Sequence, residues 1–325
     1  MNIGITVIGD KKLSLAQSSV NLNDVVGIDI MFKHCGYDSE IIETSNIAER
    51  AKEFDCLIFK AGPIINFGGK QSKHLQTEIN VINNFKGPVV IYSVDQDWTL
   101  PNKERAGFLT INRPVFFAYS GKNHNVISKK QMKDVEVLGT AEFNQAFGIW
   151  KLIAGHSTPN ISPRYDAVYC GQARAELMPI IKRISQKFSL LTWGSINKKL
   201  SNSKKLNTHT NFSSVELVAL NSLGKYTFLF FKPKTRWITP RICEQMASNS
   251  LVLFDKRWTE TKSFWTDFNT FDSEEELLSK MSANPNEEQL KIQHKILSDY
   301  DVETKTKEHV ANVIRLIQSD VNANG

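Results

Sequence analysis

Short apolar runs alternate with segments of helical periodicity along the whole chain. In the first half, runs rich in β-branched and aromatic residues predict strands at 2–8, 39–43, 55–60, 88–93, 115–119 and 135–138. The segments between them predict helices at about 24–36, 47–53, 72–85 and 142–153. Continuous apolar strands separated by helices are typical of a doubly wound parallel sheet.

The same alternation starts again after residues 154–164, a segment with two prolines and small polar residues that we expect to be a linker. The second half predicts strands at 167–169, 189–193, 226–231 and 251–254. Its predicted helices lie at about 173–186, 214–222, 284–297 and 302–318. We therefore predict an α/β protein with two Rossmann-like, doubly wound domains that face each other across a cleft.

Composition and charge exclude several classes of protein. The 325 residues are 41% hydrophobic and 23% charged, and the net charge of +6 is compatible with a polyanionic partner. The four cysteines are far apart in the sequence, which favours reduced thiols in a cytoplasmic protein. We expect no signal peptide and no membrane segment. Motifs of dinucleotide dehydrogenases, P-loop NTPases, zinc hydrolases and serine hydrolases are absent from the sequence.

The segment 238–255 combines a helix start with two charged side chains. Thr239 is suited to cap a helix, and Pro240 is suited to its first turn. Arg241 and Glu244 are three residues apart, so they share one face of that helix. Such a pair suits a nucleotide, with arginine for phosphate and glutamate for the ribose hydroxyls. The alternative is a surface ion pair on an amphipathic helix.

Further candidates in the first half lie at the carboxyl ends of the predicted strands, where open α/β sheets bind ligands. Asp95 and Asp97 follow a strand and are suited to be a general base or metal ligands, although aspartates also simply end strands. The pair Gly68-Gly69 with Lys70 is suited to phosphate binding or to a flexible turn.

Several segments together resemble the DNA β-glucosyltransferases of T-even bacteriophages, which transfer glucose from UDP-glucose to 5-hydroxymethylcytosine in double-stranded DNA. The resemblance covers most of the chain and depends on the order and spacing of its motifs. These are INFGGK (65–70), KGPVVIYSVD (86–95), NRP with the aromatics after it (112–119), YCGQAR (169–174), ITPRICEQMASNSLVLFD (238–255) and IQHKIL (292–297). The implied fold is GT-B, with an acceptor domain at 1–155, a UDP-sugar domain at 165–300, and a C-terminal helix (about 302–325) that joins the first domain.

The resemblance implies a donor site in the second half. Arg241 matches the arginine that binds the diphosphate, and Glu244 matches the glutamate that holds the ribose. Gly171 and Arg174 match the loop and the arginine around the pyrophosphate. We assign two neighbouring positions to the same site, Gln172 and Gly194.

The implied acceptor site lies in the first half. Asp95 matches the catalytic aspartate when the strand is aligned without gaps, and Asp97 matches it when Pro101 is the anchor. Asp24 stands where the family has a glutamate that contacts the sugar. Four further residues are assigned to DNA binding: Gly68, Gly69, Lys70 and Arg113.

Some positions depart from the family pattern. Gln172 replaces a serine, and Met178 replaces a second phosphate-binding arginine. Phe230 and Pro233 stand where the family has an aspartate and a tyrosine that contact the glucose. The donor is therefore expected to be UDP-glucose or another UDP-sugar, for instance the pentose donor UDP-arabinose.

The resemblance implies a DNA glycosyltransferase that inverts the anomeric carbon and acts in the cytoplasm of an infected bacterial host. We expect a monomer whose partner is double-stranded DNA containing 5-hydroxymethylcytosine. A divalent cation is compatible with the diphosphate, but the sequence has no obvious set of metal ligands. The alternatives are transfer to an already glycosylated base or to a non-DNA acceptor, and a non-catalytic DNA-binding protein on the same fold.

Overall fold

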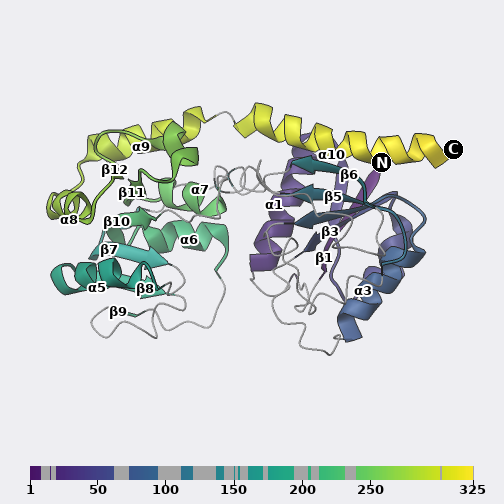
Figure 1. Cartoon of the computed structure of the whole chain (residues 1–325), viewed down its shortest axis with the longest axis horizontal. Helices are drawn as coiled ribbons and strands as arrows, with labels where there is room; N and C mark the ends of the chain where they lie inside the picture. The colour runs from purple at the N-terminus through teal and green to yellow at the C-terminus, as the bar shows by residue number, and fades with distance from the viewer. Residues whose placement is uncertain are drawn as a thin grey trace. The chain divides into compact units, whose positions relative to one another are not determined.

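The computed structural model describes residues 1–8, 15, 20–61, 73–93, 111–119, 137–142, 150, 153, 160–170, 175–193, 204–205, 212–230, 239–300 and 302–324. The chain forms two compact units, one of residues 1–151 with 302–325 and the other of residues 152–301. Figure 1 shows both units, each with a sheet and its covering helices.

Unit 1 contains a six-stranded parallel sheet in the order β2-β1-β3-β4-β5-β6. Its strands are β1 (Asn2–Ile8), β2 (Asp38–Ile41), β3 (Cys56–Ala61), β4 (Val89–Ser93), β5 (Val115–Tyr119) and β6 (Val137–Glu142). Its helices are α1 (Val20–His34), α2 (Ile47–Arg50) with the 3-10 turn Ala51–Glu53, α3 (Lys73–Asn84) and α10 (Val302–Asn324). The apolar strands thus form the parallel sheet that their pattern predicts.

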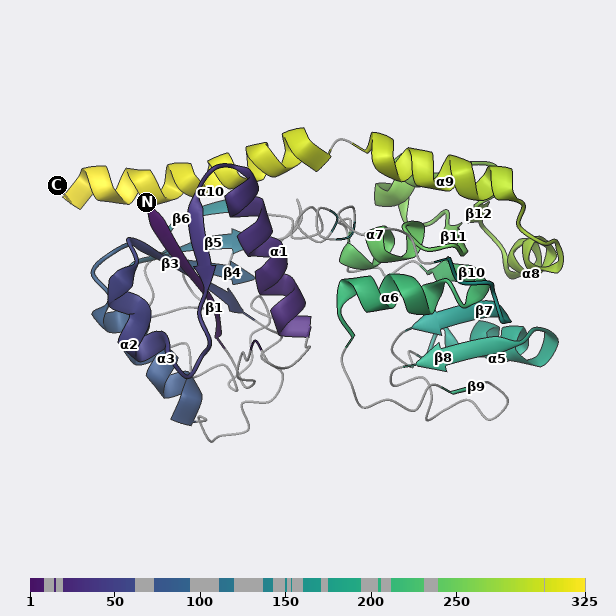
Figure 2. The ribbon, with the colours of Figure 1, turned by 180° about the vertical axis from the view of Figure 1, so that it is seen from behind.

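One face of the central strands of unit 1 packs against α3. Leu57 and Phe59 of β3 belong to a buried cluster with Ile79 and Ile82 of α3. Helices α1 and α10 contact each other, and α10 contacts β5 and β6 (Figure 2). Gly36, two residues after the end of α1, has a φ of +83°, the left-handed conformation in which many helices end.

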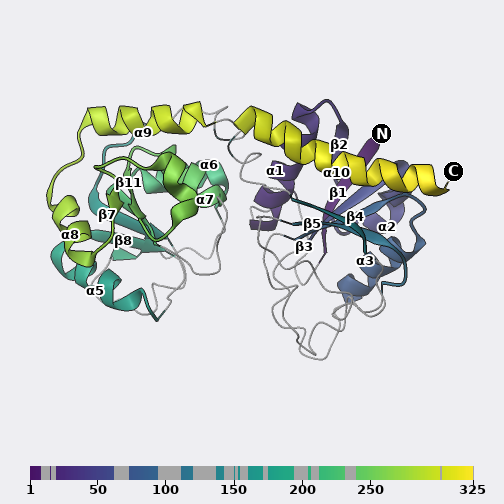
Figure 3. The same ribbon diagram turned by 45° about the horizontal axis from the view of Figure 1, so that its top comes forward.

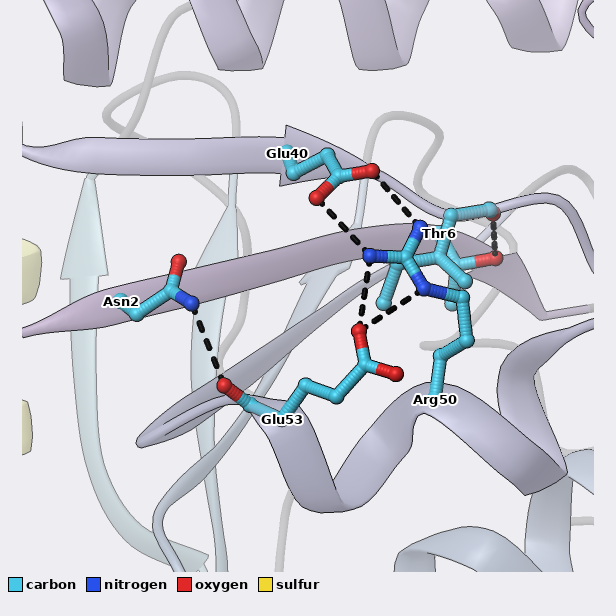
Figure 4. Close-up of polar contacts among 6 residues, drawn as sticks. Asn2, Thr6, Glu40, Arg50 and Glu53 are labelled. Atoms are coloured by element: carbon cyan, nitrogen blue, oxygen red, sulfur yellow. Dashed lines mark hydrogen bonds and ion pairs between the residues drawn. The ribbon is translucent and has the colours of Figure 1, made fainter.

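A charged cluster fastens the edge strand β2 to the turn after α2 (Figure 4). The Arg50 guanidinium donates to both carboxylate oxygens of Glu40, at 2.7 and 2.9 Å, and to Glu53 at 2.8 Å. These hydrogen bonds lower the pKa of Glu40. The cluster is largely exposed, so its contribution to the free energy of unfolding is small.

Unit 2 contains a second six-stranded parallel sheet, in the order β12-β11-β10-β7-β8-β9. Its strands are β7 (Tyr165–Cys170), β8 (Leu190–Trp193), β9 (Lys204–Lys205), β10 (Gly224–Leu229), β11 (Leu251–Asp255) and β12 (Thr270–Phe271). Its helices are α5 (Met178–Lys187), α6 (Ser214–Asn221), α7 (Pro240–Met246), the 3-10 helix Thr259–Phe264, α8 (Glu274–Ser282) and α9 (Glu287–Asp299). Helices α5 and α8 cover one face of this sheet, while α6 packs on the other face beside α7 (Figure 3).

Three helix starts differ from the sequence prediction, among them that of α9, which begins at Glu287 and not at Asn284. Helix α1 begins at Val20, four residues before Asp24, and α5 begins at Met178 instead of Ala173. In α5, Pro179 occupies the first turn, where the missing N–H of proline costs no helical hydrogen bond. The strand β9 and the 3-10 helix after β11 were not predicted. Of the predicted helix 142–153, three residues are described: Glu142 is the last residue of β6, whereas Trp150 and Ile153 are helical.

Gln293 of α9 joins α7 to β11. Its side chain accepts from the Val252 N–H at 2.9 Å and donates to the carbonyls of Met246 and Ser250 at 3.2 and 2.9 Å. The side chain is fully buried. Gln293 therefore satisfies backbone groups at the end of α7 and at the start of β11, where the helix and the strand leave them unpaired.

Replacing Gln293 with leucine is expected to lower the free energy of unfolding by about 2–3 kcal/mol, because buried backbone groups lose their partners. Urea unfolding with circular dichroism would measure the change. Lys295→Leu, an exposed position on the same helix, is the matched control and should change stability little. Equal stabilities for the two variants would contradict this role for Gln293.

Asp166 connects the amino ends of β7, β8 and β10. Its carboxylate accepts from the Ser189 N–H and hydroxyl, at 2.9 and 2.8 Å, and from the Lys225 ammonium at 3.1 Å. Burial alone would raise the pKa of Asp166, but the hydrogen bonds from Ser189 and Lys225 outweigh it and lower this pKa below 3.8. The folded state therefore favours the ionised carboxylate.

The stabilisation from Asp166 should depend on pH. It is fully present above the ordinary pKa of about 4 and is lost as the pH falls through the lowered folded-state pKa. The difference in unfolding free energy between wild type and Asp166→Asn should therefore shrink in acid. Ser189→Ala removes one donor and should weaken this dependence. A difference that is constant from pH 7 to pH 3 would contradict the assignment.

Candidate functional site

The carboxyl ends of the strands in unit 2 form the edge at which open α/β sheets bind ligands. The strand β7 lies between β8 and β10, so the chain leaves β7 on one side and returns to β10 on the other. Such a switch point leaves a crevice at the carboxyl ends of the two strands. In the sequence, Gly171 directly follows β7 and Gly194 directly follows β8.

Helix α7 begins after β10 at the predicted residue, but without the predicted side-chain cap. Thr239 occupies the N-cap position and Pro240 the first turn, but the Thr239 side chain makes no capping hydrogen bond. The helix ends at Met246, and its residues from Ile242 onward are buried. Arg241, in the first turn, is half-buried. Arg241 is thus the more accessible of the two candidate charged residues of α7.

Glu244 is buried and held from a second helix. The Glu244 side chain is only 7% exposed, and its Oε1 accepts a 2.6 Å hydrogen bond from the Ser214 hydroxyl. Ser214 is the first residue of α6, which is fixed by a capping box between Ser213 and Glu216. An exposed surface ion pair, the alternative from the sequence, therefore does not describe Glu244. A carboxylate held in one orientation is suited to accept hydrogen bonds from the vicinal hydroxyls of a ribose.

The partner of Glu244 was not predicted. In the sequence, Ser213 and Glu216 have the spacing of a capping box, which needs only these two residues. Ser214 has no part in that motif. The one indication in the sequence was that the hydroxyl of Ser214 is not needed for capping and is therefore available to another partner. It is the fold that brings Ser214 and Glu244, 30 residues apart, into contact.

Phe230, one of the positions that depart from the family pattern, is part of the buried core of unit 2. Its side chain is 5% exposed and packs against Tyr169, Phe228 and Phe271, with ring centroids 5.8 to 6.0 Å apart. A phenyl ring in this core cluster offers no hydrogen bond to a sugar hydroxyl. The other departing position, Pro233, lies outside the described residues.

Cys56 and Cys243 are buried free thiols. Burial raises the pKa of Cys243 to about 12, and it raises the pKa of Cys56 as well. Both thiols therefore stay protonated at neutral pH. Since only the thiolate is a strong nucleophile, neither side chain is suited to covalent catalysis.

In unit 1, Asp24 lies inside α1, and it does not open that helix as predicted. Its carboxylate forms an ion pair of 2.6 Å with Lys60 of β3, and both side chains are buried. Burial raises the pKa of Asp24, while the adjacent Lys60 ammonium counteracts part of that rise. Sequence reasoning missed Lys60, although a lysine within an otherwise apolar strand was a visible signal.

Arg113 lies two residues before β5, at the amino edge of the sheet. Its guanidinium donates to the carbonyls of Phe85 and Gly87, the latter at 2.8 Å, next to the carboxyl end of α3. Arg113 thus lies at the edge of the sheet opposite to the carboxyl ends of the strands. Its contacts favour a structural role, in which its guanidinium pairs with carbonyls that the end of α3 leaves unpaired. Its contact with DNA stays a prediction.

The remaining predicted site residues lie outside the described part of the chain. Asp95 follows the last residue of β4 by two positions in the sequence. The full set is Gly68, Gly69, Lys70, Asp95, Asp97, Gly171, Gln172, Arg174 and Gly194. Among the described residues, no three His, Cys, Asp or Glu side chains gather as metal ligands would. Within the same residues, no helix has the length and apolar character needed to cross a membrane.

Neither models of protein families nor curated protein sequences gave a match. Among solved structures, T4 phage β-glucosyltransferase in complex with UDP and Mn²⁺ superposes with a TM-score of 0.74 at 18% identity, covering 98% of this chain and 99% of the other. The protein has the GT-B fold.

Two further structures give the same result. The DNA-modifying enzyme β-glucosyltransferase, solved with and without uridine diphosphoglucose, matches with a TM-score of 0.72 at 17% identity over 98% of this chain and 100% of the other. The complex of the T4 enzyme with UDP-glucose has a TM-score of 0.73 at 18% identity over 98% and 99% of the two chains. The predicted resemblance and the GT-B fold are thus confirmed at the level of structure.

Proposed function

We propose that the protein is a DNA glycosyltransferase that transfers a sugar from a UDP-sugar to the hydroxymethyl group of 5-hydroxymethylcytosine. The observation that carries this proposal is the agreement in fold, over nearly the whole chain, with an enzyme that modifies DNA and has been solved with UDP-glucose. Arg241 and Glu244 support it, because they lie on the helix that starts at the carboxyl edge of the unit 2 sheet.

The donor binds through its nucleotide. Glu244, oriented by Ser214, accepts hydrogen bonds from the ribose hydroxyls. Arg241 and Arg174 pair with the diphosphate and stabilise the negative charge that develops on it as the sugar leaves. The proposal is compatible with a divalent cation bound through the diphosphate, as one T4 enzyme structure contains Mn²⁺ together with UDP.

The transfer step needs a general base. Asp95 accepts the proton of the hydroxymethyl group while the oxygen of that group forms a bond with the anomeric carbon. The bond between the anomeric carbon and the β-phosphate oxygen breaks, and UDP leaves from the opposite face with the electron pair. The anomeric configuration is therefore inverted. The target nucleotide is flipped out of the duplex, which moves its hydroxymethyl group from the major groove into the site of reaction.

The proposal leaves glucose and a pentose as alternative donors. The buried Phe230 cannot make the glucose contact that the resemblance assigns to its position. A pentose such as arabinose lacks the exocyclic hydroxymethyl group and needs fewer polar contacts. An already glycosylated base is the matching alternative for the acceptor. In either case, we propose a monomer that acts on DNA in the cytoplasm of an infected bacterium.

The test is to incubate the protein with a panel of UDP-sugars and DNA containing 5-hydroxymethylcytosine, and to identify the nucleosides by mass spectrometry. One UDP-sugar should add the mass of its sugar to 5-hydroxymethyl-2′-deoxycytidine. DNA with unmodified cytosine is the control and should stay unchanged. Transfer only to glucosylated DNA would establish the alternative acceptor. Binding of DNA without any transfer or donor hydrolysis would refute the enzymatic function.

A further inference from the structure

Leu15 exposes an apolar side chain at the carboxyl edge of the unit 1 sheet. Among the residues that the structure describes, it is the most exposed large apolar side chain, at 53%. It belongs to the connection between β1 and α1, which starts at the carboxyl end of β1. Single exposed leucines are common on protein surfaces, so exposure alone assigns no role to Leu15. Two further observations do so.

The first observation is that the backbone of Leu15 is held in place. The Leu15 N–H donates a 2.7 Å hydrogen bond to Oε1 of Glu43. Glu43 follows the last residue of β2 by two positions, and the Ile42 N–H before it donates to the carbonyl of Ile5 in β1 at 2.8 Å. A hydrogen bond from an N–H to a carboxylate is among the stronger ones in proteins. The exposed side chain therefore starts from a backbone position that is tied to the end of β2.

The second observation is the place of this position in the sheet. The strand β1 lies between β2 and β3, so the chain leaves β1 on one side and returns to β3 on the other, and open α/β sheets bind ligands at such a point. In the sequence, Lys70 follows β3 and Asp95 follows β4, so both connections start at the same edge. Lys11 and Lys12 precede Leu15 in its own connection. These lysines suit the phosphates of DNA, whereas a leucine does not.

A duplex with a flipped nucleotide offers a partner for such a leucine. Flipping costs free energy, because the stacking and pairing of the target base are lost. Proteins that separate base steps commonly insert an apolar side chain such as leucine or phenylalanine between them. The inserted side chain replaces part of the lost stacking and itself leaves water. An apolar side chain in solvent, on a fixed backbone, is suited to this insertion.

We propose that Leu15 inserts into the base stack of the DNA acceptor and fills the gap that the flipped nucleotide leaves. This inference rests on the proposed function and names a residue of unit 1 that contacts bases. Leucine has no hydrogen-bonding group in its side chain, so Leu15 holds the duplex open without reading a donor or acceptor pattern in the grooves. Its contribution is therefore greatest when the target base starts fully paired.

The experiment compares Leu15→Ala, Leu15→Phe and the control Leu138→Ala in the full-length chain. Leu138 is a second exposed leucine of unit 1, at 40%, but it lies in β6, the last strand of the sheet. Single-turnover sugar transfer is measured on two duplexes, with 5-hydroxymethylcytosine opposite guanine in one and opposite adenine in the other. The fluorescence of 2-aminopurine beside the target base reports its unstacking in the same DNA.

In Leu15→Ala, we expect transfer to the paired duplex to fall about 10- to 100-fold, the effect of removing one apolar side chain from a buried position. Transfer to the mismatched duplex should fall much less, because an unpaired base leaves the stack at a lower cost. The rise in 2-aminopurine fluorescence on binding should shrink. Leu15→Phe should keep most of the activity, Leu138→Ala should match the wild type, and the affinity for UDP should stay the same in all variants.

Two outcomes would overturn the inference. Wild-type transfer to the paired duplex by Leu15→Ala would mean that this side chain does not enter the stack. An equal loss on the paired and the mismatched duplex would mean that Leu15 acts on a step other than flipping.

The fluorescence measurement separates this inference from the proposed function. If the wild-type protein transfers no sugar from any UDP-sugar, the proposed function is wrong. Insertion of Leu15 would still be supported if the wild type unstacks the base and Leu15→Ala does not. The absence of unstacking in the wild type, or equal unstacking in both proteins, would refute it.

Discussion

Replacing Asp95 with alanine is expected to reduce the rate of sugar transfer by about 10²- to 10⁴-fold, the usual contribution of a general base. The hydroxymethyl oxygen is a weak nucleophile while it keeps its proton, so removal of the base leaves the attack on the anomeric carbon slow. Single-turnover transfer to DNA containing 5-hydroxymethylcytosine, with UDP-sugar in excess, would measure the effect directly.

Asp97→Ala is the matched control for Asp95→Ala. Both aspartates follow β4 in the sequence, two and four residues after Ser93, so the two variants differ only in which carboxylate is removed. Transfer should persist in Asp97→Ala and be almost lost in Asp95→Ala, with equal affinity for UDP. The reverse result would make Asp97 the base and Pro101 the correct anchor of the alignment. Wild-type rates in both variants would exclude either aspartate.

Replacing Arg241 with alanine is expected to reduce the transfer rate by about 10²- to 10³-fold, the range for the loss of one fixed donor to a developing charge. The diphosphate becomes more negative as its bond to the sugar breaks, so Arg241 contributes more to the transition state than to the bound donor. The rate at saturating donor should therefore fall more than the affinity for UDP. Transfer rates at saturating donor and a binding titration with UDP would measure these two quantities separately.

Arg241→Lys keeps the charge but loses the planar fork of donors, and it should recover only part of the rate. Arg183→Ala is the control, because Arg183 forms an exposed ion pair with Glu274 on a different helix of the same unit. A loss of UDP affinity in Arg241→Ala as large as the loss of rate would mean that Arg241 binds the ground state equally well. An unchanged rate would remove Arg241 from the site.

Strands were easier to predict from this sequence than helix starts. The strands at 2–8 and 115–119 have the predicted bounds, since each is a short run of mostly apolar residues that ends before Gly9 in the first case and begins after Pro114 in the second. The start of α1 was placed four residues too late because Asp24 was interpreted as a residue that opens a helix. Asp24 instead turns inward to Lys60, a contact between residues 36 apart that local pattern does not indicate.

In the candidate site too, local features were predictable from the sequence and long-range contacts were not. The positions of Arg241 and Glu244 on one short helix followed from their spacing and from the proline before them. Ser214 and Lys60 did not follow, because each meets its carboxylate only when elements that are about 30 to 36 residues apart in the sequence pack together. Long-range partners of charged side chains are determined by the packing of layers, and periodicity along one segment contains no information about them.

The position of α10 has a consequence for the order in which the protein becomes complete during synthesis. Val310, Val313, Ile314 and Ile317 of this helix are buried in unit 1, yet they are translated after every residue of unit 2. During synthesis of unit 2, the face of the unit 1 sheet that α10 covers in the complete protein is therefore exposed to solvent. A fragment that stops at residue 151 would keep that apolar face exposed permanently, so the N-terminal half is expected to aggregate when it is produced alone.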